Sequence, residues 1–220
     1  MNFMLDCEVY YDISSLTMLN SKVCALLIVY PSFMAYSSDE FNEKRNIGEV
    51  RKNAGGASTP IFAHALDSKM ELGEIFSIVK RTVRMVTGKE REGVGLMLAS
   101  LPATLGAFWE VGGNYIVVNE VLLEAMRRHC STPREFNAFV YVILTHEYLH
   151  SIGYLDELSA RKVTAQIARR CFGEEHEAWL LSSGDIWEIY PFLKYLPGGT
   201  GERLKVVTNF DPEATRGYIY

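Results

Sequence analysis

The spacing of apolar residues predicts a helix followed by two strands in the middle of the chain. Apolar residues recur at helical intervals between Met70 and Val86, and Gly88 follows them as a stop signal. Two short apolar runs, Gly93–Leu101 and Gly113–Asn119, come next and have the length and composition of buried strands. The pattern therefore favours a fold that mixes helices and strands.

Three further helices follow the second strand. Asn119 can cap a short helix over residues 120–129, whose basic last turn suits the negative end of a helix. Thr132 as N-cap, Pro133 at the first helical position and Glu135 as the partner of a capping box predict the start of a longer helix. Its apolar face is broad enough for burial, and it runs about five turns to the glycine at position 153. Another helix is expected over about 156–172.

The chain divides at one polar stretch. Ser37–Pro60 is charged and ends after a Gly-Gly pair, so it is interpreted as an exposed connection. Residues 1–60 then form an N-terminal segment packed on a main domain of residues 61–220. Within the segment, Lys22–Tyr30 predicts a buried strand, whereas Asp185–Tyr220 predicts a loop-rich tail.

Composition limits the classes of partner. The chain has 220 residues, of which 48% are hydrophobic and 22% charged, which is ordinary for one globular core. A net charge of −5 does not favour a broad nucleic-acid-binding face, so no nucleic-acid partner is expected. No apolar run reaches the length of a membrane-spanning helix, so no membrane partner is expected either.

The cysteines and the N-terminus favour a cytoplasmic location. The four cysteines are scattered without the spacing of a disulfide framework or of a metal-binding pair: Cys7, Cys24, Cys130 and Cys171. Secretion is the alternative, because a chain begun at Met18 would place an apolar run, Val23–Tyr36, behind a short basic stretch. Pro31 interrupts that run, and the acidic residues ahead of it are atypical of a signal peptide.

The segment Thr145–Glu157, "THEYLHSIGYLDE", carries the candidate chemistry. His146 and His150 are four residues apart, so on a helix both imidazoles project from one face and can hold one metal ion. Glu147 lies about 100° further round that helix, within reach of a water molecule on the metal. This arrangement, H-E-x-x-H, is the helix signature of zinc peptidases. It predicts a zinc site with Glu147 as the catalytic base.

A catalytic zinc site needs a third protein ligand. Asp156 is the first candidate, because the chain can turn sharply at Gly153 and return a carboxylate to the histidines. Asp156 is equally well placed to cap the following helix. Glu157 is the rival ligand. More distant candidates are Glu174, Glu175 and His176.

These residues resemble the zincin superfamily of metallopeptidases, and the spacing H-E-x-x-H-x-x-G-x-x-D resembles its metzincin branch. The resemblance covers about Gly93–Phe172. It implies an α+β fold with a mixed sheet packed on the active-site helix, one Zn²⁺ ion, and hydrolysis of peptide or protein substrates. It also implies an edge strand that pairs with substrate, for which the two strands predicted ahead of that helix are candidates. Metzincins place a methionine turn after the motif, but the last methionine here is Met126.

Other functions fit parts of the pattern. A degenerate zincin could use zinc only to stabilise a binding module. Another zinc hydrolase could share the spacing: peptide deformylases take a cysteine ligand from an upstream motif, and the nearest upstream cysteine here is Cys130 in "RHCSTP". A bacterial endoribonuclease family shares the histidine spacing more loosely. A helix with two histidines and no metal is the simplest alternative. Tyr154 and Tyr190 could assist catalysis or simply pack as aromatic residues.

Overall fold

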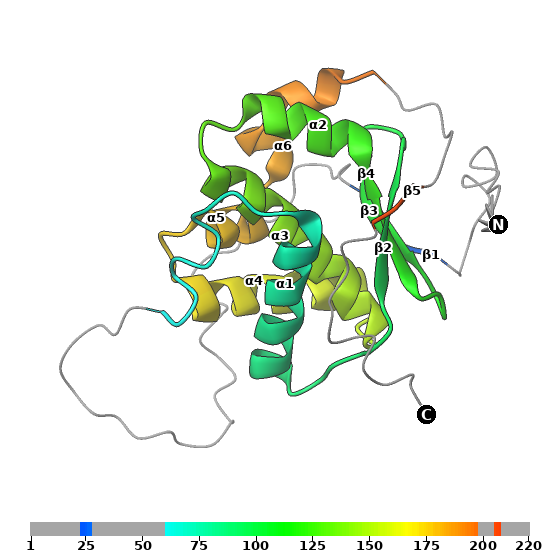
Figure 1. Cartoon of the computed structure of the whole chain (residues 1–220), viewed down its shortest axis with the longest axis vertical. Coiled ribbons are helices and arrows are strands. Elements are labelled where there is room, and N and C mark those ends of the chain that lie inside the picture. Colours follow the sequence, from blue (N-terminus) through cyan, green and yellow to red (C-terminus); the bar gives the residue numbers. More distant parts are fainter. Residues whose placement is uncertain (1–22, 28–59, 198–204, 208–220) are drawn as a thin grey trace, which may run out of the picture.

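The computed structural model describes residues 23–27, 60–197 and 205–207. These residues form an α+β fold in which the helices lie to one side of a mixed β-sheet, as expected from the sequence (Figure 1). The predicted N-terminal segment, residues 1–60, lies outside the described residues except for 23–27 and Pro60. Its packing on the main domain therefore stays a prediction.

The sheet has five strands within the described residues. Their spatial order is β1 (Val23–Leu27), β3 (Leu105–Glu110), β4 (Tyr115–Asn119), β2 (Gly95–Ala99) and β5 (Lys205–Val206). β2 and β4 are parallel, and the other neighbouring pairs are antiparallel. The predicted strands after Gly93 and Gly113 are present, and β1 lies within the predicted strand at 22–30. β3 was not predicted.

The sheet order corrects one expectation from the resemblance. β4 pairs with β3 on one side and with β2 on the other, so it is an interior strand and cannot add a substrate strand. β2 pairs with β4 along its length and with β5 at Met97 and Leu98. β1 is the edge strand on the other side of the sheet among the described residues.

Six α-helices and one 3-10 helix are described. They are α1 (Leu72–Thr87), α2 (Glu120–His129), α3 (Pro133–Ser151), α4 (Glu157–Phe172), α5 (Glu177–Ser183), α6 (Ile186–Ile189) and the 3-10 helix Pro191–Tyr195. The first four match the sequence-based predictions, whereas α5 and the short helices of the tail were not predicted. No described helix combines the length and apolarity needed to cross a membrane.

α3 is the central helix of the molecule. Every residue from Phe136 to Ser151 is buried, in keeping with its broad apolar face. At its start, the Thr132 hydroxyl accepts a hydrogen bond from the Glu135 N–H at 3.2 Å, as predicted. The Glu135 carboxylate accepts from the N–H of Ser131 rather than from that of Thr132, so only half of the predicted capping box forms.

Packing against α1 holds α3 in place. The hydroxyls of Thr82 and Tyr141 are 2.8 Å apart in the buried interface between the two helices. Two turns of α3 further on, the ring of Tyr148 packs edge-on against that of Phe76 with centroids 5.5 Å apart. Because buried polar groups are costly unless they are paired, the hydroxyl contact fixes the register of the two helices as well as their distance.

The segment before α1 anchors the start of α3. The Asn137 amide donates to the carbonyl oxygens of Leu66 and Ser68 at 2.9 and 2.6 Å. The Arg134 guanidinium lies 2.6 Å from the carboxylate of Asp67. Its hydrogen bond is the main reason why the pKa of Asp67 falls from 3.8 to about 2.

The Asp67–Arg134 ion pair predicts a pH dependence of stability. A carboxyl with a lowered pKa stabilises the fold above its unfolded pKa, and the contribution disappears as the pH falls towards the folded value. Both side chains are about one-third exposed, at 36% and 34%, so solvent screening limits the contribution to about 1 kcal/mol or less. We expect Asp67→Asn to lower the free energy of unfolding by this amount at pH 7 and to have little effect near pH 2.

Unfolding in urea with a chelator present, at pH 2 to 7, measures this difference without a contribution from bound metal. Unfolding curves of Asp67→Asn and the wild type that differ by a constant amount over the whole range would contradict the prediction.

Candidate metal centre

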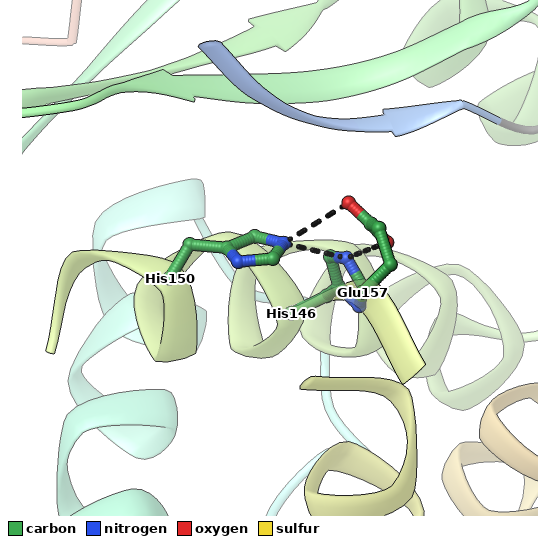
Figure 2. A group of neighbouring side chains, drawn as sticks. All are labelled: His146, His150 and Glu157. Atoms are coloured by element: carbon green, nitrogen blue, oxygen red, sulfur yellow. Dashed lines mark hydrogen bonds and ion pairs between the residues drawn. The ribbon is translucent and has the colours of Figure 1, made fainter. Parts of the chain in front are cut away.

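The end of α3 and the start of α4 bring three side chains together: His146, His150 and Glu157 (Figure 2). The connection between the helices is short because the chain turns at Gly153, whose φ of 103° is disfavoured for other residues. The N–H of Tyr154 then bonds back to the carbonyl of Leu149 at 3.0 Å. This turn places the first residue of α4 opposite the last two turns of α3.

The three groups form a compact triangle of ligand atoms. The Nε2 atoms of His146 and His150 are 3.0 Å apart. The carboxylate oxygens of Glu157 lie 3.1 Å from the first and 3.3 Å from the second. Ligands at 2.0–2.2 Å from a tetrahedral zinc ion are about 3.3–3.6 Å from one another. The distances between these side chains are slightly shorter, and the two histidines contact different oxygens of Glu157. The three side chains therefore converge closely enough to hold one metal ion.

The protonation of His150 shows why a cation suits this triangle. Its Nδ1 lies 2.6 Å from the carbonyl oxygen of Tyr154. A carbonyl oxygen only accepts hydrogen bonds, so Nδ1 carries the proton and the Nε2 of a neutral ring presents a lone pair. That lone pair faces an oxygen of Glu157, which is also an acceptor. The contact is favourable when a metal ion, or a proton on either the ring or the carboxyl, lies between the two atoms.

Electrostatics favour the protonation states that a metal requires. Burial is the main influence on His146, and it lowers the pKa of the ring so that the neutral form predominates at neutral pH. Burial alone would raise the pKa of Glu157, but the close imidazoles of His146 and His150 outweigh this effect and lower it to about 2. A neutral imidazole and an ionised carboxylate are the forms that bind metal ions.

The structure corrects the order of the two candidate carboxylates. Glu157 lies against both histidines, whereas Asp156 is exposed and accepts a hydrogen bond from the N–H of Ser159 at 2.8 Å. Asp156 is thus the N-cap of α4 and is not part of the triangle. The hydrogen bond from Ser159 also holds the pKa of Asp156 below its usual range. Of the two carboxylates predicted as candidates, the structure thus places Glu157, and not Asp156, beside the histidines.

Glu147, the predicted catalytic base, follows His146 on α3 and is fully buried. Its neighbours His146 and His150 are 2% and 0% exposed, whereas the side chain of Glu157 is 37% exposed. Solvent therefore reaches the triangle from the side of Glu157. Two surface hollows, one between Gln166 and Glu174 and one against the outer side of α1, involve none of these residues.

The more distant ligand candidates lie elsewhere. Glu174 pairs with Arg169, and Glu175 is exposed. His176 is buried as the N-cap of α5, where its Nδ1 accepts from the N–H of Ala178 at 3.0 Å. None of the three joins the triangle.

The two tyrosines have separate roles. Tyr190 is buried and donates its hydroxyl to Glu135 at 3.3 Å, which makes it a packing residue near the start of α3. Tyr154 contributes its backbone carbonyl to His150, while its ring lies 4.6 Å from the ammonium of Lys89. The sequence holds no signal for this carbonyl contact, because any residue type supplies the same backbone oxygen.

The edge of the sheet lies next to the triangle. Figure 2 shows β1 running along the side of α3 from which the three side chains project. No other described strand pairs with the outer side of β1. The site therefore combines three converging ligands with an adjacent strand edge.

Comparisons with known proteins give no match for this chain: no protein-family model, no curated protein and no solved structure matches it.

Proposed function

We propose that the protein is a zinc-dependent peptidase of the zincin type. The observation that carries the proposal is the convergence of two imidazole Nε2 atoms and one carboxylate at 3.0–3.3 Å, with a buried Glu147 next to His146 in the sequence. Two histidines and a carboxylate leave one position open in a tetrahedral site, which is the composition of catalytic rather than structural zinc centres. The pattern H-E-x-x-H favours zinc over other metals that accept the same ligands.

The residues divide the chemistry among them. His146, His150 and Glu157 would hold the ion, which would supply Lewis acidity and lower the pKa of a water molecule. Glu147 would act as the base that accepts a proton and passes it to the leaving amine. The Tyr154 carbonyl keeps the proton of His150 on Nδ1 and so directs Nε2 at the ion.

Peptides are the proposed substrates because of the strand edge beside the triangle. An extended peptide can add to an open edge through main-chain hydrogen bonds, which brings a backbone carbonyl rather than a side chain towards the ligands. β1 offers such an edge among the described strands. In this proposal β1 takes the substrate-pairing role that the resemblance suggested for β2 or β4.

A metal-stabilised binding module is the second candidate. Burial of both histidines and of Glu147 favours it, because a structural site needs no access for substrate. The ion would then join α3 to α4 without turnover. Retained zinc without hydrolysis distinguishes this function from the first.

The proposed cellular setting is the cytoplasm, with neither nucleic acid nor membrane as partner. The free thiols of Cys130 and Cys171 support a reducing compartment, and the net charge of −5 supports the absence of a nucleic-acid partner. Burial raises the pKa of both thiols to about 12, so they are suited to packing rather than to reaction.

Metal removal tests the peptidase proposal. We expect the zinc-loaded full chain to cleave members of a mixed peptide library, a chelator to abolish cleavage, and added zinc to restore it. Mass spectrometry of the products measures all three steps. Library peptides left intact by a zinc-loaded chain would contradict the peptidase function and favour the binding module.

A further inference from the structure

Arg91, in the connection between α1 and β2, is bonded to the last turn of α3. Its backbone N–H donates to the hydroxyl of Tyr148 at 2.8 Å, and the same hydroxyl donates to its carbonyl oxygen at 3.1 Å. Its guanidinium donates to the carbonyl oxygen of Ser151 at 3.3 Å. Tyr148 and Ser151 lie on either side of His150, so these contacts hold the turn that carries a proposed ligand.

The same guanidinium is bonded to the sheet. A second nitrogen donates to the carbonyl oxygen of Gly113 at 2.9 Å and to the side-chain oxygen of Asn114 at 3.1 Å. The Gly113 carbonyl also accepts from the indole N–H of Trp109 at 2.8 Å, and the Trp109 ring lies 5.4 Å from the guanidinium carbon. Arg91 therefore connects α3 with the turn between β3 and β4.

This turn continues directly into the edge of the sheet. Trp109 is buried in β3 and pairs with Cys24 of β1. The contacts thus run without a break from the ligand-bearing turn of α3, through Arg91, to the strand that holds β1. A shift of Arg91 would change the position of the triangle relative to the sheet edge.

We propose that Arg91 is a positioning residue that sets the separation between the metal-ligand triangle and the sheet edge where the substrate backbone lies. This role rests on the proposed function, because it concerns the alignment of a peptide with the metal. Arginine suits the role because its planar guanidinium donates in several fixed directions at once. Lysine has the same charge but a single nitrogen, which cannot reach all three acceptors in the same geometry.

The test compares Arg91→Lys and Tyr148→Phe with a control, Arg84→Lys. Tyr148→Phe removes both bonds to the Arg91 backbone but keeps the ring that packs on Phe76, so it provides a second variant if Arg91→Lys folds poorly. Arg84 is an exposed arginine of α1 that pairs with Glu90 outside this set of contacts. Each full-length chain is loaded with zinc for kinetics and with Co²⁺ for NMR.

The indole N–H of Trp109 reports the geometry, because a paramagnetic Co²⁺ ion shifts a nearby resonance according to its position relative to the ion. Trp109→Phe assigns the signal. We expect the shift to change in Arg91→Lys and Tyr148→Phe and to stay constant in Arg84→Lys. A loss of stability alone would not change the shift of the folded chain.

In the zinc-loaded enzymes, kcat/KM is expected to fall about 10- to 100-fold with metal content unchanged, since a displacement of about 1 Å can cost about 100-fold.

Two results would overturn the positioning role in distinguishable ways. A Trp109 shift and kcat/KM equal to the wild-type values in both variants, with metal bound, would refute the role of Arg91 alone. A wild-type chain that binds neither zinc nor Co²⁺ would refute the metal centre and with it every role defined relative to the metal.

Discussion

Replacing Glu147 with glutamine is expected to lower kcat/KM for peptide hydrolysis by about 10²- to 10⁴-fold while zinc remains bound. Glutamine keeps the shape of the side chain at a fully buried position, so packing around α3 is preserved. It cannot accept a proton from water or return one to the leaving amine. A fall in kcat/KM with zinc retained therefore measures the contribution of proton transfer alone.

Activity and zinc content are measured together for this variant. Glu124→Gln is the matched control, because Glu124 is an exposed glutamate of α2 paired with Arg128. It should match the wild type in both properties. Undiminished activity of Glu147→Gln with zinc retained would remove Glu147 from the mechanism and refute the peptidase chemistry proposed for this site.

The zinc affinities of two acid-to-amide variants, Glu157→Gln and Asp156→Asn, are expected to show which residue is a metal ligand and which only caps the helix. Removing the charge of Glu157 should weaken zinc binding by more than about 100-fold, since even outer residues around metal sites contribute about 10- to 100-fold. Asn at position 156 still caps α4, so zinc affinity should stay near that of the wild type.

Thermal unfolding gives a second readout for the same pair. Zinc at a thousand times its Kd stabilises a folded chain by about 4.1 kcal/mol, so the wild type and Asp156→Asn should unfold at clearly higher temperature with zinc than without it. Glu157→Gln should lose most of this difference. The opposite ranking, with Asp156→Asn losing zinc and Glu157→Gln retaining it, would show that the connection between α3 and α4 rearranges when metal binds.

The helices around the site could be predicted because their signals are local. Thr132, Pro133 and the glycine at 153 mark both ends of α3, and its apolar face indicates burial. His146 and His150 could be placed side by side because their spacing alone puts them on one face of a helix. These features depend on neighbours within a few residues, so the sequence contains them in full.

The choice between Asp156 and Glu157 depends on packing across the molecule. Both acids stand at a helix start, where one can cap and the other can face a partner. Adjacent residues on a helix differ by about 100° in direction, so the orientation of α4 against α3 decides which carboxylate meets the histidines. That orientation comes from tertiary contacts, and no local pattern encodes it.

The strand order could not be predicted for the same reason. β3 was missed because its sequence, "LGAFWE", has a glycine at the second position and no clear alternation of polar and apolar residues. If β3 is not predicted, the strand at Gly113–Asn119 has no neighbour on that side and is mistaken for an edge strand. Pairing of β3 with β1 joins residues that are far apart in the sequence, such as Val23 and Glu110.

Metal content tests most directly whether His146 and His150 belong to a metal centre. The full chain, purified under zinc-replete conditions and freed of loosely bound ions, is analysed by elemental mass spectrometry beside His146→Ala and His150→Ala. We predict about one zinc ion per wild-type chain, with almost none in either variant. A wild-type chain without metal, or variants that hold as much zinc as the wild type, would contradict the metal centre.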